Sequence, residues 1–215
     1  MIRPELTVLY ADESMLVLDK PAGLLSVPGR GEDKQDCLSA RAQCLYPDAS
    51  VVHRLDMATS GLMVMARGAL AQRALNQAFA NRCVRKRYIA VVDGQLGHSL
   101  QSCGVIDLPI IVDWPERPRR IIDCLRGKPS VTRWRVLSHN VSDGTTRVEL
   151  EPVTGRSHQL RVHLLALGHA IVGDALYGSP GVQAKADRLL LHACSLEICH
   201  PVSAQPMCFF STALF

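Results

Sequence analysis

Residues 53–62 read HRLDMATSGL, and the apolar run Met63–Ala66 follows them directly. The stretch places one carboxylate, Asp56, beside a histidine and an arginine at the edge of what reads as a buried strand. A lone aspartate before a strand is most often a turn residue that bonds its own backbone. A carboxylate at a buried edge must be hydrogen-bonded or paired, because an unpaired buried charge is costly. The stretch therefore predicts either a turn aspartate or a pocket-edge acid that acts as nucleophile or base.

Strands predominate among the elements that the rest of the chain predicts. Apolar runs and alternating faces, bounded by turn residues, indicate them. The expected strands are two short ones about a turn at 11–14, a glycine-bounded run at 61–68, residues 84–94, a pair at 130–139 and 145–153, and residues 188–200. Because strands outnumber helices and do not alternate with them regularly, the pattern favours an α+β fold. We expect a single domain over residues 1–215, with a mixed, mostly antiparallel sheet, flanking helices and a basic cleft.

Three helices are expected beside these strands. The first covers residues 37–46 with Asp36 as its cap, and the third runs from a Ser157 cap to Leu167, where Gly168 ends it. The second covers residues 69–82 and has Leu70, Ala74, Leu75 and Phe79 on one face. Residues 94–128 have a mixed character and read as loop.

Composition limits the classes of protein. The 215 residues carry 24 Lys+Arg against 20 Asp+Glu, and this mild excess of positive charge supports a nucleic-acid partner only weakly. Aromatic residues make up 5%, which argues against a long stacking ladder for single-stranded RNA. No apolar run approaches the roughly 18 residues of a membrane span, and the N-terminus does not read as a signal peptide. The eight cysteines include no C-x-x-C, and a reducing cytoplasm is the simplest compartment. We also expect a monomer.

A second candidate segment is GRSHQLRVHLLALGH, residues 155–169. On a helix, His158 and Arg161 share a face, while Leu160 lies on the neighbouring face toward the core. Arg156 lies at the helix start, where its charge opposes the macrodipole, so an anionic partner would explain it. The alternative for this segment is a solvated basic face.

Two further segments carry basic or aromatic side chains. In the strand at 84–94, Lys86 and Tyr88 are two residues apart, so their side chains lie on the same face. The alternative for Tyr88 is an ordinary half-buried strand tyrosine. The loop at 113–120 reads DWPERPRR, and its arginines are Arg117, Arg119 and Arg120. Two prolines restrict its backbone, so the loop suits phosphate contacts. The alternative is a stiff loop whose charges only keep the protein in solution.

Other classes of chemistry fit the sequence poorly. H-E-x-x-H is absent, and His158 and His163 diverge by about 140° around a helix, so we expect no metal site. An aspartic protease would need a second facing carboxylate, and the chain has no second segment like residues 56–61. The stretch KPAGLLSVPGRG lacks the G-x-x-x-x-G-K-[ST] of a P-loop.

Four motifs in order resemble those of the RluA-type pseudouridine synthases. They are LDKPAGLLSVPG, HRLDMATSGL, RKRYIAVV and GRSHQLRVHLLALGHAIVGDALYG, and together they extend along nearly the whole chain. The chain is most similar to the dual-specificity members, which act on large-subunit ribosomal RNA and on transfer RNA. Because the first motif lies close to the start of the sequence, we expect no S4-type RNA-binding domain of the kind that several relatives carry.

The resemblance implies a role for each candidate residue. Asp56 would be catalytic, Arg161 would pair with it and keep it ionised, and Tyr88 would stack on the base and help remove the C5 proton. The reaction breaks the N1–C1′ bond of a uridine, turns the base and rejoins it through C5, with no cofactor or metal. The remaining residues would bind substrate: Leu160 beneath the ring, Arg54 in the place of the flipped base, His53 ordering the loop, Lys86 on the tyrosine strand, and Arg156, Arg117, Arg119 and Arg120 on phosphates.

Two questions stay open at this point. The carboxylate could add to C1′, or it could take the C2′ proton to give a glycal. A non-catalytic RNA-binding module with the same fold is the alternative to an enzyme, and a metal hydrolase is a more distant one. The presence of Asp56, Tyr88 and Arg161 together argues for the enzyme.

Overall fold

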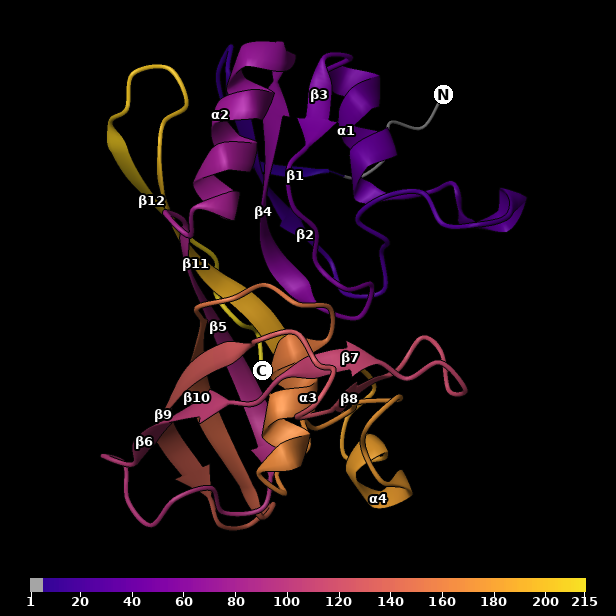
Figure 1. The fold of residues 1–215 in the computed structure, drawn as a ribbon, viewed down its shortest axis with the longest axis vertical. Coiled ribbons are helices and arrows are strands. Elements are labelled where there is room, and N and C mark those ends of the chain that lie inside the picture. Colours follow the sequence, from indigo (N-terminus) through magenta and orange to yellow (C-terminus); the bar gives the residue numbers. More distant parts are fainter. Residues whose placement is uncertain (1–5) are drawn as a thin grey trace. The chain divides into compact units, whose positions relative to one another are not determined.

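The computed structural model describes residues 6–215, which form two compact units (Figure 1). Unit 1 comprises residues 6–86 and 193–214, and unit 2 comprises residues 87–192 with residue 215. Two strands, β5 (Arg85–Asp93) and β11 (Leu191–Cys199), begin in one unit and end in the other. The candidate residues are therefore distributed over two units, each with its own geometry.

The strands of unit 1 follow the order β1-β2-β4-β11, with β3 paired to β4 and β12 paired to β11. The pairs β1–β2, β2–β4, β3–β4 and β11–β12 are antiparallel, and the turn at 11–14 that joins β1 to β2 was predicted correctly. The elements of this unit are β1 (Thr7–Ala11), β2 (Met15–Lys20), η1 (Glu32–Lys34), α1 (Leu38–Leu45), β3 (Ala49–Val51), β4 (Ser60–Arg67), α2 (Gly68–Ala80) and β12 (Pro206–Phe210).

Both faces of the β2–β4 pair are buried, which explains why these strands read as continuous apolar runs rather than alternating ones. Val17 and Val64 face a cluster that includes Ala71 and Leu75 of α2. Their neighbours in sequence point the other way, into a cluster that includes Leu38 and Ala42 of α1. Every residue from Met15 to Leu18 is fully buried as a result.

In unit 2, four strands follow the order β5-β10-β9-β6, and β7 and β8 form a separate two-stranded sheet. Helix α3 packs against β8, β9 and β10, and Figure 1 shows it lying across these strands. The remaining elements are β6 (Cys103–Asp107), β7 (Ile110–Val112), β8 (Arg120–Ile122), β9 (Val131–Asn140), β10 (Thr145–Pro152), α3 (Gln159–Ala166) and α4 (Pro180–Gln183).

The reading of residues 94–128 as loop was wrong. Strands β6, β7 and β8 lie there, and β7 and β8 are three residues long. Such short strands carry no detectable alternation, and the pairing of β6 with β9 depends on a partner far along the chain. The short strands β3 and β12 were missed for the same reason.

Several details of the predicted helices were also wrong. Helix α1 is capped by the sulfur of Cys37, which accepts a hydrogen bond from the Ala40 N–H, and Asp36 instead pairs with Arg41. Helix α3 begins after His158, which has a left-handed backbone (φ 58°), rather than after a Ser157 cap. Leu70 on α2 is 75% exposed, so the apolar face of that helix is narrower than expected.

Candidate active site

Asp56 lies in the loop between β3 and β4, and the residues on both sides of it are held in place. The Ser26 hydroxyl donates to the Leu55 carbonyl (2.7 Å) and accepts from the Leu55 N–H (3.1 Å). On the other side, the Met57 carbonyl accepts from the backbone N–H of Gly23 (2.9 Å). Asp56 is half-buried between these anchors. The loop after β2 therefore fixes the backbone that carries the carboxylate.

Lys20 completes this support from beneath the loop. Its side chain is fully buried, and its ammonium donates to the carbonyls of Pro21 (2.9 Å), Leu24 (2.7 Å) and Met57 (3.1 Å). Burial lowers the pKa of Lys20 to about 8, and the negative charge of Asp56 opposes that shift. The lysine thus brings a positive charge near Asp56 while its three donors bond neutral oxygens.

His53 is a structural residue of the same loop. Its Nε2 accepts a hydrogen bond from the Val64 N–H (2.9 Å), and its ring stacks on Phe79 (centroids 4.5 Å apart). Burial lowers the pKa of His53 to about 3, and the positive charge of Lys86 adds to that shift. The neutral ring thus accepts a hydrogen bond from a backbone N–H of β4 just beyond the point where β3 stops pairing with that strand. This geometry supports the role in ordering the loop.

The other basic candidates of unit 1 differ in exposure. Arg54 is exposed, whereas Lys86 is half-buried, with its ammonium 5.9 Å from the ring centroid of Phe79. Burial lowers the pKa of Lys86. His53, Phe79 and Lys86 therefore form one cluster beside the Asp56 loop, and Arg54 extends from that loop into solvent.

Gly61 explains why the HRLDMATSGL stretch ends in a glycine. Its φ of 109° disfavours any side chain, and a Cβ there would lie 2.3 Å from the Ala193 carbonyl oxygen on β11. The glycine lets two strands of unit 1 approach each other directly after the Asp56 loop.

In unit 2, Tyr88 lies on β5 opposite Leu150 of β10, and it is buried. Leu160, in the first turn of α3, is also buried. Arg156 is exposed before that helix, and its Nε donates to the Pro129 carbonyl (3.3 Å).

Arg161 is only 4% exposed, which rules out the solvated basic face as an account of this residue. Its Nε and Nη2 donate to the two carboxylate oxygens of Asp174 (2.8 and 2.6 Å). Asp174 is fully buried and also accepts from the backbone N–H groups of Leu176 and Tyr177. A two-pronged pair of this kind fixes the plane of the guanidinium.

Tyr177 connects this pair to the basic loop. Its ring centroid lies 5.0 Å from the Arg161 guanidinium and 5.5 Å from that of Arg119. Its hydroxyl accepts from the Arg120 N–H (2.8 Å) and lies 2.7 Å from the Nδ1 of His158. The buried tyrosine therefore joins α3 to the β7–β8 hairpin.

The three arginines of the basic loop have different environments. Arg117 stacks on Trp114, Arg119 lies over Tyr177, and the Arg120 Nη1 donates to the carbonyls of Pro118 and Arg119. Asp113 and Glu116 are the acids of the same loop. Figure 1 shows the loop projecting from the β7–β8 hairpin.

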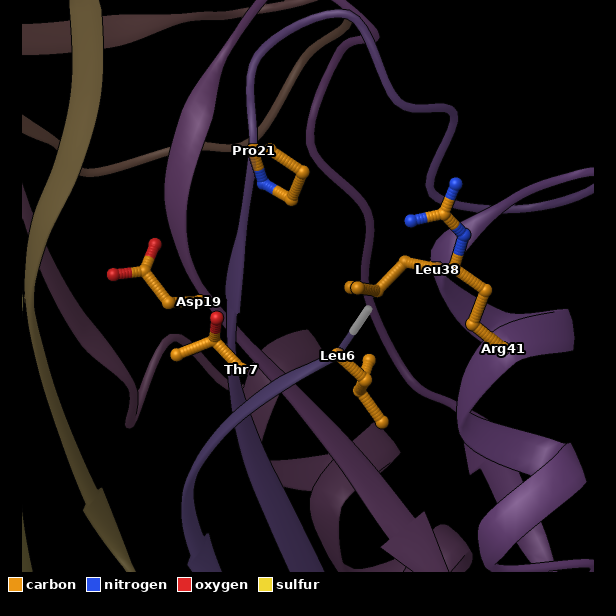
Figure 2. A pocket seen from close by; sticks show the side chains of 6 residues that line it. All are labelled: Leu6, Thr7, Asp19, Pro21, Leu38 and Arg41. Atoms are coloured by element: carbon orange, nitrogen blue, oxygen red, sulfur yellow. The ribbon is translucent and has the colours of Figure 1, made fainter. Parts of the chain in front are cut away.

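A pocket of about 250 Å³ lies in unit 1, and Asp56 is not among the residues that line it (Figure 2). Its lining residues come from β1, β2 and α1 and from the segments next to them. They are Leu6, Thr7, Asp19, Pro21, Leu38 and Arg41. Arg41 is already paired with Asp36, so the pocket adds no candidate catalytic group.

Within residues 6–215, no three His, Cys, Asp or Glu side chains gather closely enough to hold a metal ion. Over the same residues, no helix has the length and apolar character needed to span a membrane. All eight cysteines belong to this part of the chain and are free thiols.

Sequence reasoning missed Lys20, Asp174 and Tyr177. Two signals pointed to them: a lysine that ends the apolar run MLVLDK, and the acid and tyrosine of the quoted GDALYG. Neither signal identifies the partner, because the hydrogen-bond partners lie up to 57 residues away in the chain.

The comparisons with known proteins identify the family. Residues 14–166 match the family model described as RNA pseudouridylate synthase. The chain is 50% identical over 212 residues to the "Dual-specificity RNA pseudouridine synthase RluA" of Escherichia coli O6:H1, covering 99% of this chain and 95% of the relative. It is 46% identical over 214 residues to the protein of that name from Haemophilus ducreyi, covering 100% and 96%.

A solved structure confirms the fold class. The structure titled "Human RNA Pseudouridylate Synthase Domain Containing 1" is similar with a TM-score of 0.80 and 30% identity, covering 97% of this chain and 83% of that one. The expected α+β fold, with a mostly antiparallel sheet and few helices, is the fold of a pseudouridine synthase domain.

Proposed function

The chain belongs to the RNA pseudouridylate synthase family and is an RNA pseudouridine synthase, and on that premise we propose that it has dual specificity. The substrates would be uridines in large-subunit ribosomal RNA and in transfer RNA anticodon stem-loops. The identity of 46–50% over nearly the full length of relatives named as dual-specificity enzymes carries this proposal. The eight free thiols are consistent with work in a reducing cytoplasm.

In the proposed reaction, the Asp56 carboxylate acts on the ribose of a uridine that has left its stack. Leaving the stack costs on the order of a few kcal/mol, and exposed Arg54 would fill the vacated place. The N1–C1′ bond breaks, the uracil turns, and a C5–C1′ bond forms while the C5 proton is removed and N1 gains a proton. Addition of the carboxylate to C1′ and removal of the C2′ proton both remain compatible with this scheme. The same ring is leaving group and nucleophile, so atoms balance without a co-reactant.

The support for Asp56 is the way in which its backbone is held. Ser26 and Lys20 fix the residues on either side, so the carboxylate is positioned before substrate binds. We assign Tyr88 to stack on the base and Leu160 to pack beneath it, and both side chains are buried. Arg161 would pair with Asp56 through a guanidinium that Asp174 already orients.

The basic loop and Arg156 would bind phosphates. Replacing Arg117, Arg119 and Arg120 with Gln should weaken RNA binding more than the chemical step. Each lost contact should flatten the plot of log affinity against log salt by about 0.7 to 0.9. A matched control replaces Arg133 and Arg135, exposed arginines of β9 that are paired with Glu151 and Glu149. An unchanged salt slope in the triple variant would show that the loop does not touch the RNA backbone.

The direct test of function is pseudouridine formation by the purified chain. Tritium release from C5-labelled RNA should occur with both a ribosomal stem-loop and an anticodon stem-loop. Mapping of pseudouridines in RNA from a deletion strain would then locate the positions lost in each class. Activity on only one class would overturn dual specificity, and activity on neither would overturn the enzyme assignment.

A further inference from the structure

Trp114 is unusually exposed for a tryptophan. It lies in the loop between β7 and β8, 64% of its surface is accessible, and the chain has only one other tryptophan. Large aromatic side chains are usually well buried. The guanidinium carbon of Arg117 lies 3.4 Å from the ring centroid. One face of the indole is therefore covered by Arg117, and the exposed surface belongs to the opposite face and the edge.

The loop that presents this ring is ordered before any partner binds. The Asp113 N–H donates to the Arg119 carbonyl (3.1 Å), and the Arg119 N–H donates to the Glu116 carbonyl (2.9 Å). At the start of β8, the Arg120 N–H donates to the Tyr177 hydroxyl (2.8 Å). A ring held this way loses little conformational entropy on binding.

The surroundings of the ring restrict the ligand that it fits. In the sequence, charged residues flank the ring on both sides, Asp113 before it and Glu116 and Arg117 after it, so it is one flat aromatic surface in a charged segment. Such a surface is far too small for the core of a protein interface. Among residues 6–215, no hydrogen-bond partner reaches the buried Nε of Arg119 in the same loop. A planar aromatic group attached to an anion matches an indole that has Arg117 on one face and the Arg119 Nε in the same loop.

We propose that Trp114, backed by Arg117, is a stacking platform for an unpaired base of the substrate RNA, distinct from the target uridine. The inference rests on the proposed function, in which Tyr88 and Leu160 take the target base and the basic loop meets phosphates. Unpaired bases in RNA loops are commonly bound by stacking on aromatic side chains. The guanidinium behind the indole strengthens such a stack through a cation–π contact. The loop then holds one nucleotide by its base as well as by its phosphate.

The first experiment uses the fluorescence of Trp114 itself. Trp134 is half-buried on β9, and the substitution Trp134→Phe leaves Trp114 as the only tryptophan in the sequence. Titration with a stem-loop substrate should quench its emission, because a stacked base contacts the indole directly. Emission that stays unchanged at saturating RNA overturns the proposal.

The second experiment measures affinity. Trp114→Leu keeps an apolar side chain but removes the π-face, and we expect RNA binding to weaken by about 5- to 150-fold, which corresponds to the ~1–3 kcal/mol of one base stack. Trp114→Phe should retain most of the affinity. Leu125→Ala is the matched control, because Leu125 is a 96% exposed apolar residue on the segment after β8. Equal affinity of Trp114→Leu and the wild type overturns the proposal.

The third experiment identifies the base. An abasic site is placed at each unpaired position of the stem-loop in turn, and each RNA is bound to the wild type and to Trp114→Leu. At one position other than the target, the abasic site should lower the affinity of the wild type but not that of Trp114→Leu. In a double-mutant cycle, this result means that the missing base and Trp114 contact each other. Additive losses at every such position overturn the proposal. Tritium release by the wild-type chain tests the enzyme assignment separately, so failure of the stack and failure of the function give different results.

Discussion

Two buried cations, Lys20 in unit 1 and Arg161 in unit 2, are held in opposite ways. Lys20 donates to three backbone carbonyls, whereas Arg161 forms a two-pronged ion pair with Asp174. Carbonyls do not cancel a charge, so burial lowers the pKa of Lys20 to about 8. A buried carboxylate compensates a guanidinium and fixes its plane. Lys20 holds the backbone of the Asp56 loop in place, and Asp174 holds the guanidinium of Arg161 in place.

If Lys20 and Arg161 both act on Asp56, replacing Asp56 itself should have the largest effect on the reaction rate. Asp56→Asn keeps the shape and removes the charge, so we expect no detectable pseudouridine, with fold and RNA binding retained. Loss of a catalytic nucleophile or base costs many orders of magnitude in rate. Tritium release measures the rate, and circular dichroism with RNA binding provides the control. Substantial turnover by the variant would remove Asp56 from the chemistry.

The next effect concerns the ion pair of unit 2. Arg161→Met should abolish activity and lower the free energy of unfolding by about 3–5 kcal/mol, because fully buried Asp174 loses its partner. Adding Asp174→Asn should recover much of that stability, as measured by denaturant unfolding at neutral pH.

A second double variant, Arg161→Met with Asp56→Asn, tests the proposed contact of Arg161 with Asp56. If the stability of Arg161→Met also recovers on addition of Asp56→Asn, the result would support the pairing of Arg161 with Asp56. Recovery with Asp174→Asn alone would confine Arg161 to its partner in unit 2. No recovery with either substitution would contradict coupling of the arginine to both carboxylates.

The lysine should have a smaller effect on stability. Lys20→Met fills the same space but leaves the carbonyls of Pro21, Leu24 and Met57 without their donor. Since the cost of burying a charge disappears at the same time, we expect a net loss of about 1–3 kcal/mol. The turnover rate should fall because the Met57 side of the loop is released. Lys34→Met, at an exposed lysine of unit 1, is the control, and an equal turnover rate in both variants would argue against the positioning role.

The effect that is smallest at neutral pH, and grows only as the pH falls, is a pH dependence that comes from His53. The pKa of this residue is lowered from 6.5 to about 3 in the folded chain, so the unfolded chain binds a proton first as pH falls. The stability that neutral His53 contributes is thus present above pH 6.5 and is lost as pH falls toward about 3, by at most ~1.4 kcal/mol per pH unit. Denaturant unfolding between pH 7 and pH 4 should show a steeper slope for the wild type than for His53→Gln. Exposed His98→Gln should keep the wild-type slope.

The sequence predicted the parts of the fold that depend on neighbouring residues. The apolar runs of β2 and β4 and the turn at 11–14 were found because burial on both faces leaves a local signal. Strands β7 and β8 were missed because three residues carry no periodicity, and a proline-rich loop separates them. The caps of α1 and α3 were wrong because a cysteine sulfur and a left-handed histidine took the places expected for Asp36 and Ser157.

The candidate site shows the same limit. The motif that contains Asp56 identified the acid, and the third motif contained Arg161. The residues that hold them could not be ranked from sequence, since Lys20 acts through main-chain oxygens that every residue possesses. Asp174 was one acid among 20 Asp and Glu residues until the fold brought it to Arg161.

Gly61 bears on how a survey of all single substitutions should be interpreted. A glycine whose absent Cβ would collide with the Ala193 backbone should tolerate no replacement, so a growth screen would score Gly61 as severely as Asp56. The two positions differ in the amount of folded protein left in the cell, which should fall for Gly61 variants and persist for Asp56→Asn. Intolerance to mutation thus marks two kinds of residue five positions apart in this chain, one needed for folding and one proposed to act in the reaction. Measuring the abundance of the protein together with growth separates the two.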